Sequence, residues 1–160
     1  MSKFRLFEKE INIRDYHCLK NNSNEKHQAD PYVNIYVRLQ NECNAKCKFC
    51  EFTSKEKYFN VVRFTTGFRQ ISEKINIKKV SFTGGEPTLD PPLLNGCLKF
   101  VKDVDSNIFT VVNTNGLNLS RIEIDNLDSI ALSRHHYDDN INNKILGFRS
   151  ISTNELSNFR

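Results

Sequence analysis

Residues 32–50 read YVNIYVRLQNECNAKCKFC, so a candidate strand runs directly into a loop with three cysteines. Apolar and polar side chains alternate over residues 33–39, and a period of two predicts a strand. The loop places Cys43, Cys47 and Cys50 in a C-x3-C-x2-C spacing. Packing alone does not account for three thiols within eight residues, so the spacing favours a metal site.

Strands and helices alternate along the rest of the chain. Further strands are predicted over residues 78–83, 109–113 and 129–132. Helical spacing marks residues 66–77. Asp90 is expected to cap a second helix, because the first turn of a helix accepts residues such as Pro91 and Pro92, which lack an amide donor.

Capping-box spacings predict two more helix starts, one at Ser120 with Glu123 and one at Ser152 with Glu155.

The alternation of strands and helices implies an α/β fold with a parallel sheet and right-handed crossovers. The cysteine loop and the other polar clusters of the chain all follow the carboxyl end of a predicted strand. Parallel α/β folds build their sites at that edge.

Residues 1–30 are expected to form an N-terminal extension, and residues 31–160 a single main body. Weak alternation over residues 4–13 predicts a short hairpin packed on the body. Residues 21–30 are almost entirely polar and end at a proline, which indicates a loop between the extension and the body.

The bulk composition is that of a soluble globular domain, with 160 residues, 38% hydrophobic and 26% charged. No run approaches the roughly 18–20 apolar residues of a membrane helix, and the N-terminus lacks a secretion signal, so we expect a cytoplasmic protein. The net charge of +4 comes from dispersed Lys and Arg, which does not indicate specific binding of nucleic acid.

Cysteine thiolates suit zinc, copper(I) or iron–sulfur clusters. Structural zinc takes four ligands in close pairs, and this sequence has no second C-x2-C pair, although a plain zinc site remains an alternative. Cys18 is isolated, and Cys97 is on the apolar face of a predicted helix, where a core thiol is expected. Three clustered thiols suit a four-iron cubane with one iron left open.

The cysteine spacing, with Phe49 before the third cysteine, resembles the motif of the radical S-adenosyl-L-methionine (SAM) superfamily. The sequence GGEP at residues 84–87, after the second predicted strand, resembles a second motif of that family. The resemblance implies that Cys43, Cys47 and Cys50 hold three irons of a 4Fe-4S cluster, while the methionine part of SAM chelates the fourth. It also implies that Phe49 lies beside the adenine.

The same resemblance assigns Gly84, Gly85 and Glu86 to the binding of the SAM amino group. A Gly-Gly pair lets a backbone turn sharply and approach a ligand closely, although tight turns use the same pair. After the third strand, family members often place polar groups near the SAM ribose or the substrate. Asn113 is therefore expected to contact a ligand, and Asn115 is a weaker candidate, with an ordinary Asn-Gly turn as the alternative.

Ser133 and Arg134 follow the fourth predicted strand, where related enzymes use a serine and a basic residue for the ribose and the methionine carboxylate. Arginine suits a carboxylate because its planar fork donates two parallel hydrogen bonds, and the alternative is a surface ion pair. His135 and His136 are at the same edge, and they either contact the substrate, transfer a proton or are simply solvated.

The resemblance implies a radical SAM enzyme that cleaves SAM reductively to a 5′-deoxyadenosyl radical and abstracts hydrogen from a small-molecule or peptide substrate. It also implies an external electron donor, and we assign no catalytic side chain beyond the cluster and SAM sites.

The fold that the resemblance implies is a partial TIM-type barrel. Here it is an open or incomplete sheet with about four strand–helix units, whereas the family core has six. The chain is therefore interpreted as truncated, as a minimal variant, or as completed by a partner chain or oligomer. A degenerate module without turnover is the alternative function.

Overall fold

The computed structural model describes residues 3–6, 9–12, 32–50, 59–152 and 154–155. Its strands are β1 (Lys3–Leu6), β2 (Lys9–Asn12), β3 (Tyr32–Gln40), β4 (Asn76–Gly84), β5 (Phe109–Thr114) and β6 (Ser129–Leu132). Its α-helices are α1 (Val61–Ser72), α2 (Pro91–Val104) and α3 (Asp139–Leu146). Short 3-10 turns are η2 (Pro87–Leu89), η3 (Leu119–Arg121) and η4 (Ile124–Asn126).

The main sheet has the order β3-β4-β5-β6, and every pairing is parallel. Each strand therefore pairs with its predecessor after a crossover, which confirms the predicted α/β class. The sheet does not close: in the part of the chain that the structure describes, β3 and β6 are its two edges. The hairpin predicted near the N-terminus is confirmed as the antiparallel pair β1 and β2, whose side chains are outside the described part.

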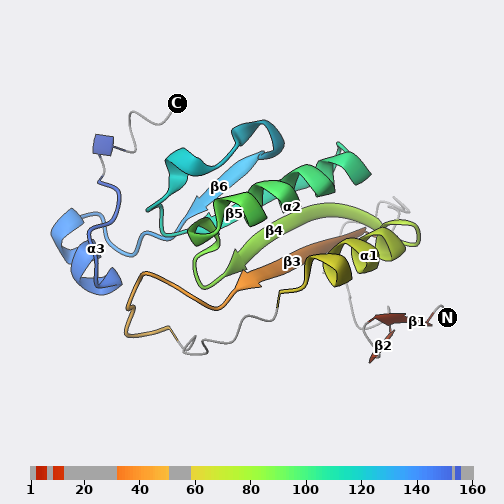
Figure 1. Ribbon diagram of the computed structural model, residues 1–160. Coiled ribbons are helices and arrows are strands. Elements are labelled where there is room, and N and C mark those ends of the chain that lie inside the picture. Colours follow the sequence, from red (N-terminus) through yellow and green to blue (C-terminus); the bar gives the residue numbers. More distant parts are fainter. Residues whose placement is uncertain (1–2, 7–8, 13–31, 51–58, 153, 156–160) are drawn as a thin grey trace, which may run out of the picture.

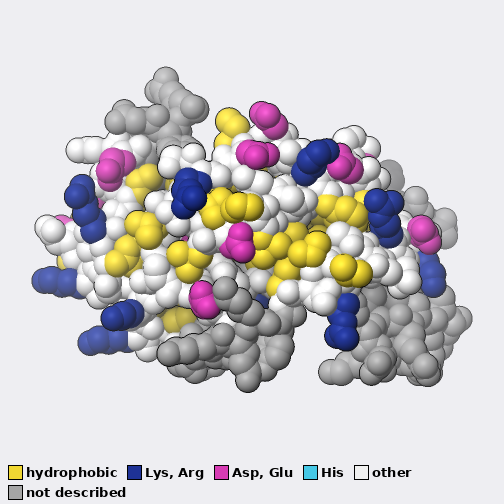
Figure 2. Space-filling view, in the orientation of Figure 1, with side chains coloured by type: hydrophobic (Ala, Val, Ile, Leu, Met, Phe, Trp, Pro, Cys, Tyr) yellow, Lys and Arg dark blue, Asp and Glu magenta, His cyan; other side chains and the backbone are white. Residues whose placement is uncertain are grey.

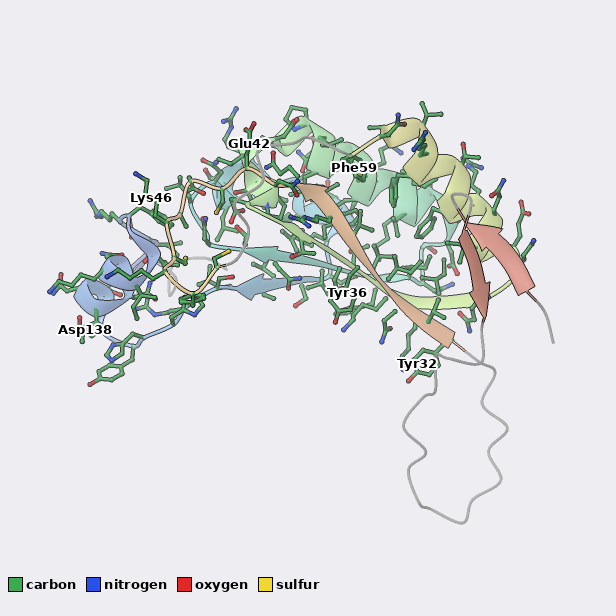
Figure 3. All side chains as sticks on the ribbon, turned by 90° about the horizontal axis from the view of Figure 1, so that it is seen from below. Tyr32, Tyr36, Glu42, Lys46, Phe59 and Asp138 are labelled. Carbon is green, nitrogen blue, oxygen red and sulfur yellow. The ribbon has the colours of Figure 1, made fainter. Side chains whose placement is uncertain are left out.

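The helices α1 and α2 cover one face of the main sheet (Figures 1 and 3). The hydrophobic core fills the space between these two layers, and its most buried side chains are those of Val80, Phe82, Leu94, Leu98, Val101 and Val112. Figure 2 shows this helical face of the molecule, where apolar side chains alternate with charges of both signs. No single basic stripe crosses the described part of that face.

The opposite face of the sheet carries more polar side chains. Tyr36 on β3 is paired in register with Ser81 on β4, and Ser81 is paired with Val111 on β5. Tyr36 is 67% exposed and lies on the side of the sheet away from the two helices (Figure 3). Parallel sheets normally have both faces covered, and among the described helices α1 and α2 lie on the other face.

Two predicted helix positions are wrong. The first helix runs over Val61–Ser72 rather than 66–77, because the Asn60 side chain accepts a hydrogen bond from the Arg63 amide at 3.0 Å and caps the helix earlier. The helix expected after Ser120 is replaced by the turns η3 and η4, which have no side-chain cap. The Glu123 amide donates to Asn95 Oδ1 at 3.1 Å. This amide is therefore not available to the Ser120 side chain, as a capping box requires.

The other two caps are confirmed. Asp90 accepts a hydrogen bond from the Leu93 amide at 3.2 Å at the start of α2. Ser152 and Glu155 form a reciprocal capping box: the Glu155 amide donates to Ser152 Oγ at 3.1 Å, and the Ser152 amide donates to Glu155 Oε2 at 2.8 Å. Of the helix that this box would start, the structure describes residues 154–155.

All four strands of the main sheet end at the same edge, and α3 lies beyond that edge (Figure 1). Loops that follow β3, β4, β5 and β6 therefore converge on one region. The described part of the chain contains no helix with the length and apolar content needed to cross a bilayer.

Candidate functional site

The carboxyl edge of the sheet brings together the predicted site residues. The cysteine loop follows β3, the GGEP turn follows β4, Asn113 and Asn115 are at the end of β5, and Ser133 and Arg134 follow β6. Cys97 is not part of this region: it is 2% exposed in the core, where burial and, secondarily, the Asp90 charge raise the pKa of its thiol to about 12. The expected core role of Cys97 is confirmed, and Cys18 lies outside the described residues.

Backbone hydrogen bonds join the end of β3 to the GGEP turn. The Gly85 amide donates to the Gln40 carbonyl at 2.7 Å, and the Glu86 amide donates to the Glu42 carbonyl at 2.8 Å. The Gln40 side chain donates in return to the Glu86 carbonyl. The GGEP turn therefore holds the first residues of the cysteine loop, immediately before Cys43.

Only glycine fits at the first two positions of this turn. A Cβ atom on Gly84 would lie 2.3 Å from the Gln40 carbonyl oxygen, and Gly84 has a φ of +135°. A Cβ atom on Gly85 would lie 2.1 Å from the Glu42 carbonyl oxygen. Both obstacles are backbone atoms, which a side-chain rotation cannot move. The Gly-Gly pair thus has a role within the protein in addition to the ligand role expected for it.

The Glu86 carboxylate is a buried hydrogen-bond acceptor that joins three segments. Glu86 is 1% exposed. Its Oε1 accepts from the Thr88 amide at 3.0 Å, from the Thr88 hydroxyl at 2.7 Å and from the Thr114 hydroxyl at 2.6 Å. Its Oε2 accepts from the Asn115 amide at 2.7 Å. A buried carboxylate is tolerated when such donors replace water, and these donors attach the GGEP turn to the end of β5.

The Asn115 side chain extends this network to the cysteines. Its Nδ2 donates to Asn44 Oδ1 at 2.8 Å and to Cys43 Sγ at 3.9 Å. Its Oδ1 accepts from the Leu117 amide at 3.1 Å. Asn115 is 5% exposed, so these contacts are shielded from water. Asn113, in contrast, is half-buried at the end of β5.

The opposite side of the cysteine loop is attached to α3. The Lys46 amide donates to the carbonyl of Leu146, the last residue of the helix, at 2.8 Å. Gly147 ends the helix with a φ of +75°, and a Cβ atom there would lie 3.1 Å from Lys46 Cβ. Figure 3 shows Lys46 next to α3, with Asp138 at the other end of the helix. The C-terminal turn of α3 is therefore a support for the loop.

Phe49 contacts the segment that follows β6. Its ring centroid lies 4.7 Å from that of His135, with the planes at 68°, an edge-to-face geometry that aromatic pairs favour. The His135 amide donates to Asn142 Oδ1 at 2.9 Å, and Asn142 Nδ2 donates to Ser150 Oγ at 2.8 Å. Phe49 is 60% exposed, so it is accessible to a ligand despite this contact.

Arg134 is engaged within its own loop. Its guanidinium donates to the Tyr137 carbonyl at 2.9 Å, to the Ile151 carbonyl at 3.3 Å and to the Asp139 carboxylate. These contacts fold the segment after β6 onto α3. The Ser133 amide donates to the Thr114 carbonyl at 2.7 Å and continues the β5–β6 pairing, while Ser133 itself is exposed.

The cysteine thiols are perturbed by their surroundings. Cys43 is exposed as a residue, yet the protein around its sulfur removes water from it. This desolvation raises the pKa of the Cys43 thiol, and the charges of Glu86 and Cys50 add to the effect. Desolvation, followed by the charges of Cys43 and Cys50, also raises the pKa of Cys47. Binding of a metal to these thiols would therefore release protons.

The thiols of the cysteine loop could bind a metal, and hydrogen-bond donors face one of them. The Ala45 amide donates to Cys43 Sγ at 3.3 Å, in addition to Asn115, and such donors favour the thiolate form that metals require. Within residues 32–50, 59–152 and 154–155, no three His, Cys, Asp or Glu side chains are gathered closely enough for one ion.

The model of the Radical SAM superfamily matches residues 37–156 of this chain, which include all four loops of the carboxyl edge. The chain belongs to the radical SAM superfamily. A crystal structure of Streptococcus suis SuiB bound to the precursor peptide SuiA shares the fold of this radical SAM chain, with a TM-score of 0.60 and 23% identity. That similarity covers 75% of this chain and 28% of SuiB, and it supports an open section of a barrel.

Curated relatives of this radical SAM chain have different names. A Thermoplasma volcanium protein named "Probable GTP 3',8-cyclase" is 28% identical over 126 residues, which are 75% of this chain and 38% of that protein. A Methanocaldococcus jannaschii protein, whose name describes a glycyl-radical enzyme activating enzyme, is 32% identical over 97 residues. The match covers 60% of this chain and 35% of that protein. This chain thus spans less than two fifths of either relative's length.

Several residues of the site were not predictable as site residues from the sequence. Asn142 is a polar residue inside a helix, and nothing in its sequence neighbourhood marks it as 1% exposed. Gln40 reads as the end of a strand. From the sequence, Asn115 is a weaker ligand candidate, and only the structure shows its contact with Cys43.

Proposed function

We propose that this chain binds a 4Fe-4S cluster through Cys43, Cys47 and Cys50 and is the cluster- and SAM-binding part of an enzyme that cleaves SAM reductively. The observation that carries the proposal is the direct bonding of the cysteine loop to the GGEP turn at the carboxyl edge of a parallel sheet. Two family motifs that are 34 residues apart, from Cys50 to Gly84, thereby form one site.

The residues present have definite parts in this proposal. Gly84 and Gly85 would hold the SAM amino group through their backbone, while the Glu86 side chain, whose carboxylate already accepts four hydrogen bonds, would fix the turn. Phe49, which is 60% exposed, would contact the adenine. Asn113 and Ser133, at the ends of neighbouring strands, would contact the ribose or the substrate. Arg134 stays a prediction for the methionine carboxylate, since its observed contacts hold the loop after β6.

Cys43, Cys47 and Cys50 would hold the cluster, which with bound SAM would supply one-electron, hydrogen-abstracting chemistry. This chain's contribution would be to hold the three thiolates on one loop. The loop is braced on both sides, by the Glu86 amide on one and by the Leu146 carbonyl on the other. Burial and hydrogen bonds to sulfur would adjust the reduction potential of the cluster.

A small-molecule or peptide substrate and an external electron donor complete the proposal. The named relatives include a GTP cyclase and an activating enzyme, and the SuiB structure contains a precursor peptide, so the superfamily itself does not select a substrate. The face of the sheet around the exposed Tyr36 is a candidate surface for the substrate or for a partner chain that completes the barrel. The alternative is a module that binds the cluster or SAM without turnover.

The test is an anaerobic assay of SAM cleavage by the protein reconstituted with iron and sulfide and reduced with dithionite. We expect methionine and 5′-deoxyadenosine in equal amounts, and at least a hundredfold less from Cys47→Ala. Cys97→Ala is the matched control, because that thiol is buried in the core, and it should retain the activity. Absence of 5′-deoxyadenosine from a protein that carries a complete cluster would favour the module without turnover.

A further inference from the structure

Asn115 lies between the GGEP network and the cysteine loop. Its backbone amide is fixed by Glu86 Oε2 at 2.7 Å, and its side-chain oxygen is fixed by the Leu117 amide at 3.1 Å. The side-chain Nδ2 is therefore directed by contacts on two sides. It faces Asn44 Oδ1 at 2.8 Å and Cys43 Sγ at 3.9 Å.

The Asn115 donor is placed where it can affect the electronic state of a thiolate. Cys43 Sγ also accepts from the Ala45 amide at 3.3 Å, so two N–H groups face one sulfur. A hydrogen bond to a cluster-ligating sulfur withdraws electron density and stabilises the reduced cluster, which raises the reduction potential. Asn115 is 5% exposed, so the N–H group that faces Cys43 belongs to a buried side chain.

We propose that Asn115 is a positioning residue that orients the Cys43 arm of the cysteine loop and raises the reduction potential of the cluster through its side-chain N–H. The proposal rests on the proposed function, because it requires a cluster on Cys43. It adds that Asn115 affects the reduction potential of the cluster and does not bind SAM.

Asn44 makes it possible to separate the two roles of Asn115. Asn44 Nδ2 is a buried donor without a hydrogen-bond partner in the structure. In Asn115→Asp, the Asn44 amide can rotate so that this donor reaches the new carboxylate, and the Leu117 amide keeps its acceptor. The bridge between the two loops then survives, while the N–H group that faces Cys43 is lost.

Asn118→Asp is the matched control. Asn118 belongs to the same loop, and its Nδ2 donates to the Thr88 carbonyl at 3.1 Å rather than to the cysteine loop. This variant introduces the same charge and loses one amide donor as well. A shift that is larger in Asn115→Asp than in Asn118→Asp, and that the uncharged Asn115→Ser also shows, therefore reports on the contact with Cys43.

The experiment is a redox titration of the reconstituted chain without SAM, followed by electron paramagnetic resonance. At the wild-type midpoint potential, the ratio of reduced to oxidised cluster should fall about tenfold in Asn115→Asp, a shift of about −59 mV for one electron. Asn118→Asp should change the ratio by less than threefold. Asn115→Ser should behave like Asn115→Asp, because its hydroxyl is too short to reach Cys43.

Equal potentials for the wild type, Asn115→Asp and Asn115→Ser would overturn the role of Asn115 while leaving the proposed function intact. An equal shift in Asn115→Asp and Asn118→Asp would also overturn it, since added charge alone would then explain the change. A wild-type protein that takes up no cluster would overturn both proposals. If Asn115→Asp does not fold, as judged by thermal unfolding, Asn115→Ser alone decides the question.

Discussion

Glu86→Gln is expected to lower the free energy of unfolding by about 3 kcal/mol, although it changes one atom of a side chain. The wild-type carboxylate accepts four hydrogen bonds, three at Oε1 and one at Oε2. A glutamine amide offers one oxygen, so its NH2 group must face donors on the other side. If the oxygen serves Thr88 and Thr114, the Asn115 amide loses its acceptor and meets a second donor. A buried donor without a partner costs about 1–3 kcal/mol, and the remaining bonds lose the contribution of the charge.

Chemical denaturation of the wild type and Glu86→Gln measures this effect. Glu123→Gln is the control at an exposed position, and it should change the free energy of unfolding by less than about 0.5 kcal/mol. A loss below about 1 kcal/mol in Glu86→Gln would contradict the role of the carboxylate as the link between the GGEP turn and β5.

Gly85→Ala is expected to destabilise the protein by about 3 kcal/mol and to displace the start of the cysteine loop. The added Cβ would lie 2.1 Å from the Glu42 carbonyl oxygen and 2.7 Å from that of Asn41. Neither backbone atom can move without breaking the bond of 2.8 Å between the Glu86 amide and the Glu42 carbonyl. Overpacking costs about 1–3 kcal/mol, and a lost hydrogen bond adds about 1 kcal/mol.

Gly96→Ala provides the matched control for Gly85→Ala. Gly96 is exposed within α2, and a Cβ atom there would have nothing within 4 Å. Alanine is about 1 kcal/mol better than glycine inside a helix, so Gly96→Ala should raise the melting temperature while Gly85→Ala lowers it. Thermal unfolding followed by circular dichroism compares the three proteins. Equal stability of Gly85→Ala and the wild type would contradict the close approach of the two loops.

The parallel sheet could be predicted from the sequence because its determinants are local. The alternation over residues 33–39 lies within β3, and the apolar spacing after Asp90 marks α2. The predicted first helix is misplaced because the prediction misses the local cap at Asn60, whereas the helix predicted after Ser120 is wrong because a tertiary contact competes with a local signal. Ser120 and Glu123 have capping-box spacing, yet Asn95, on α2, accepts the hydrogen bond that the box would need.

The residues of the candidate site could be named from motifs, but their contacts could not. The motif GGEP suggests a ligand for Glu86, whereas the structure shows its carboxylate bound to Thr88, Thr114 and the Asn115 amide. The Thr114 hydroxyl and the Asn115 amide are 28 and 29 residues from Glu86 in the chain, and no sequence periodicity predicts such contacts. Arg134 likewise reads as a candidate anion ligand, and only the fold shows its contact with Asp139.

The measurement that tests the account most directly is the electron paramagnetic resonance spectrum of the reduced, reconstituted protein with and without SAM. We expect a 4Fe-4S signal that changes when SAM is added, because SAM would bind the iron that lacks a protein ligand. The signal should disappear in Cys47→Ala and persist in Cys97→Ala. A protein that binds zinc tightly, or that takes up no cluster under careful reconstitution, would contradict the account.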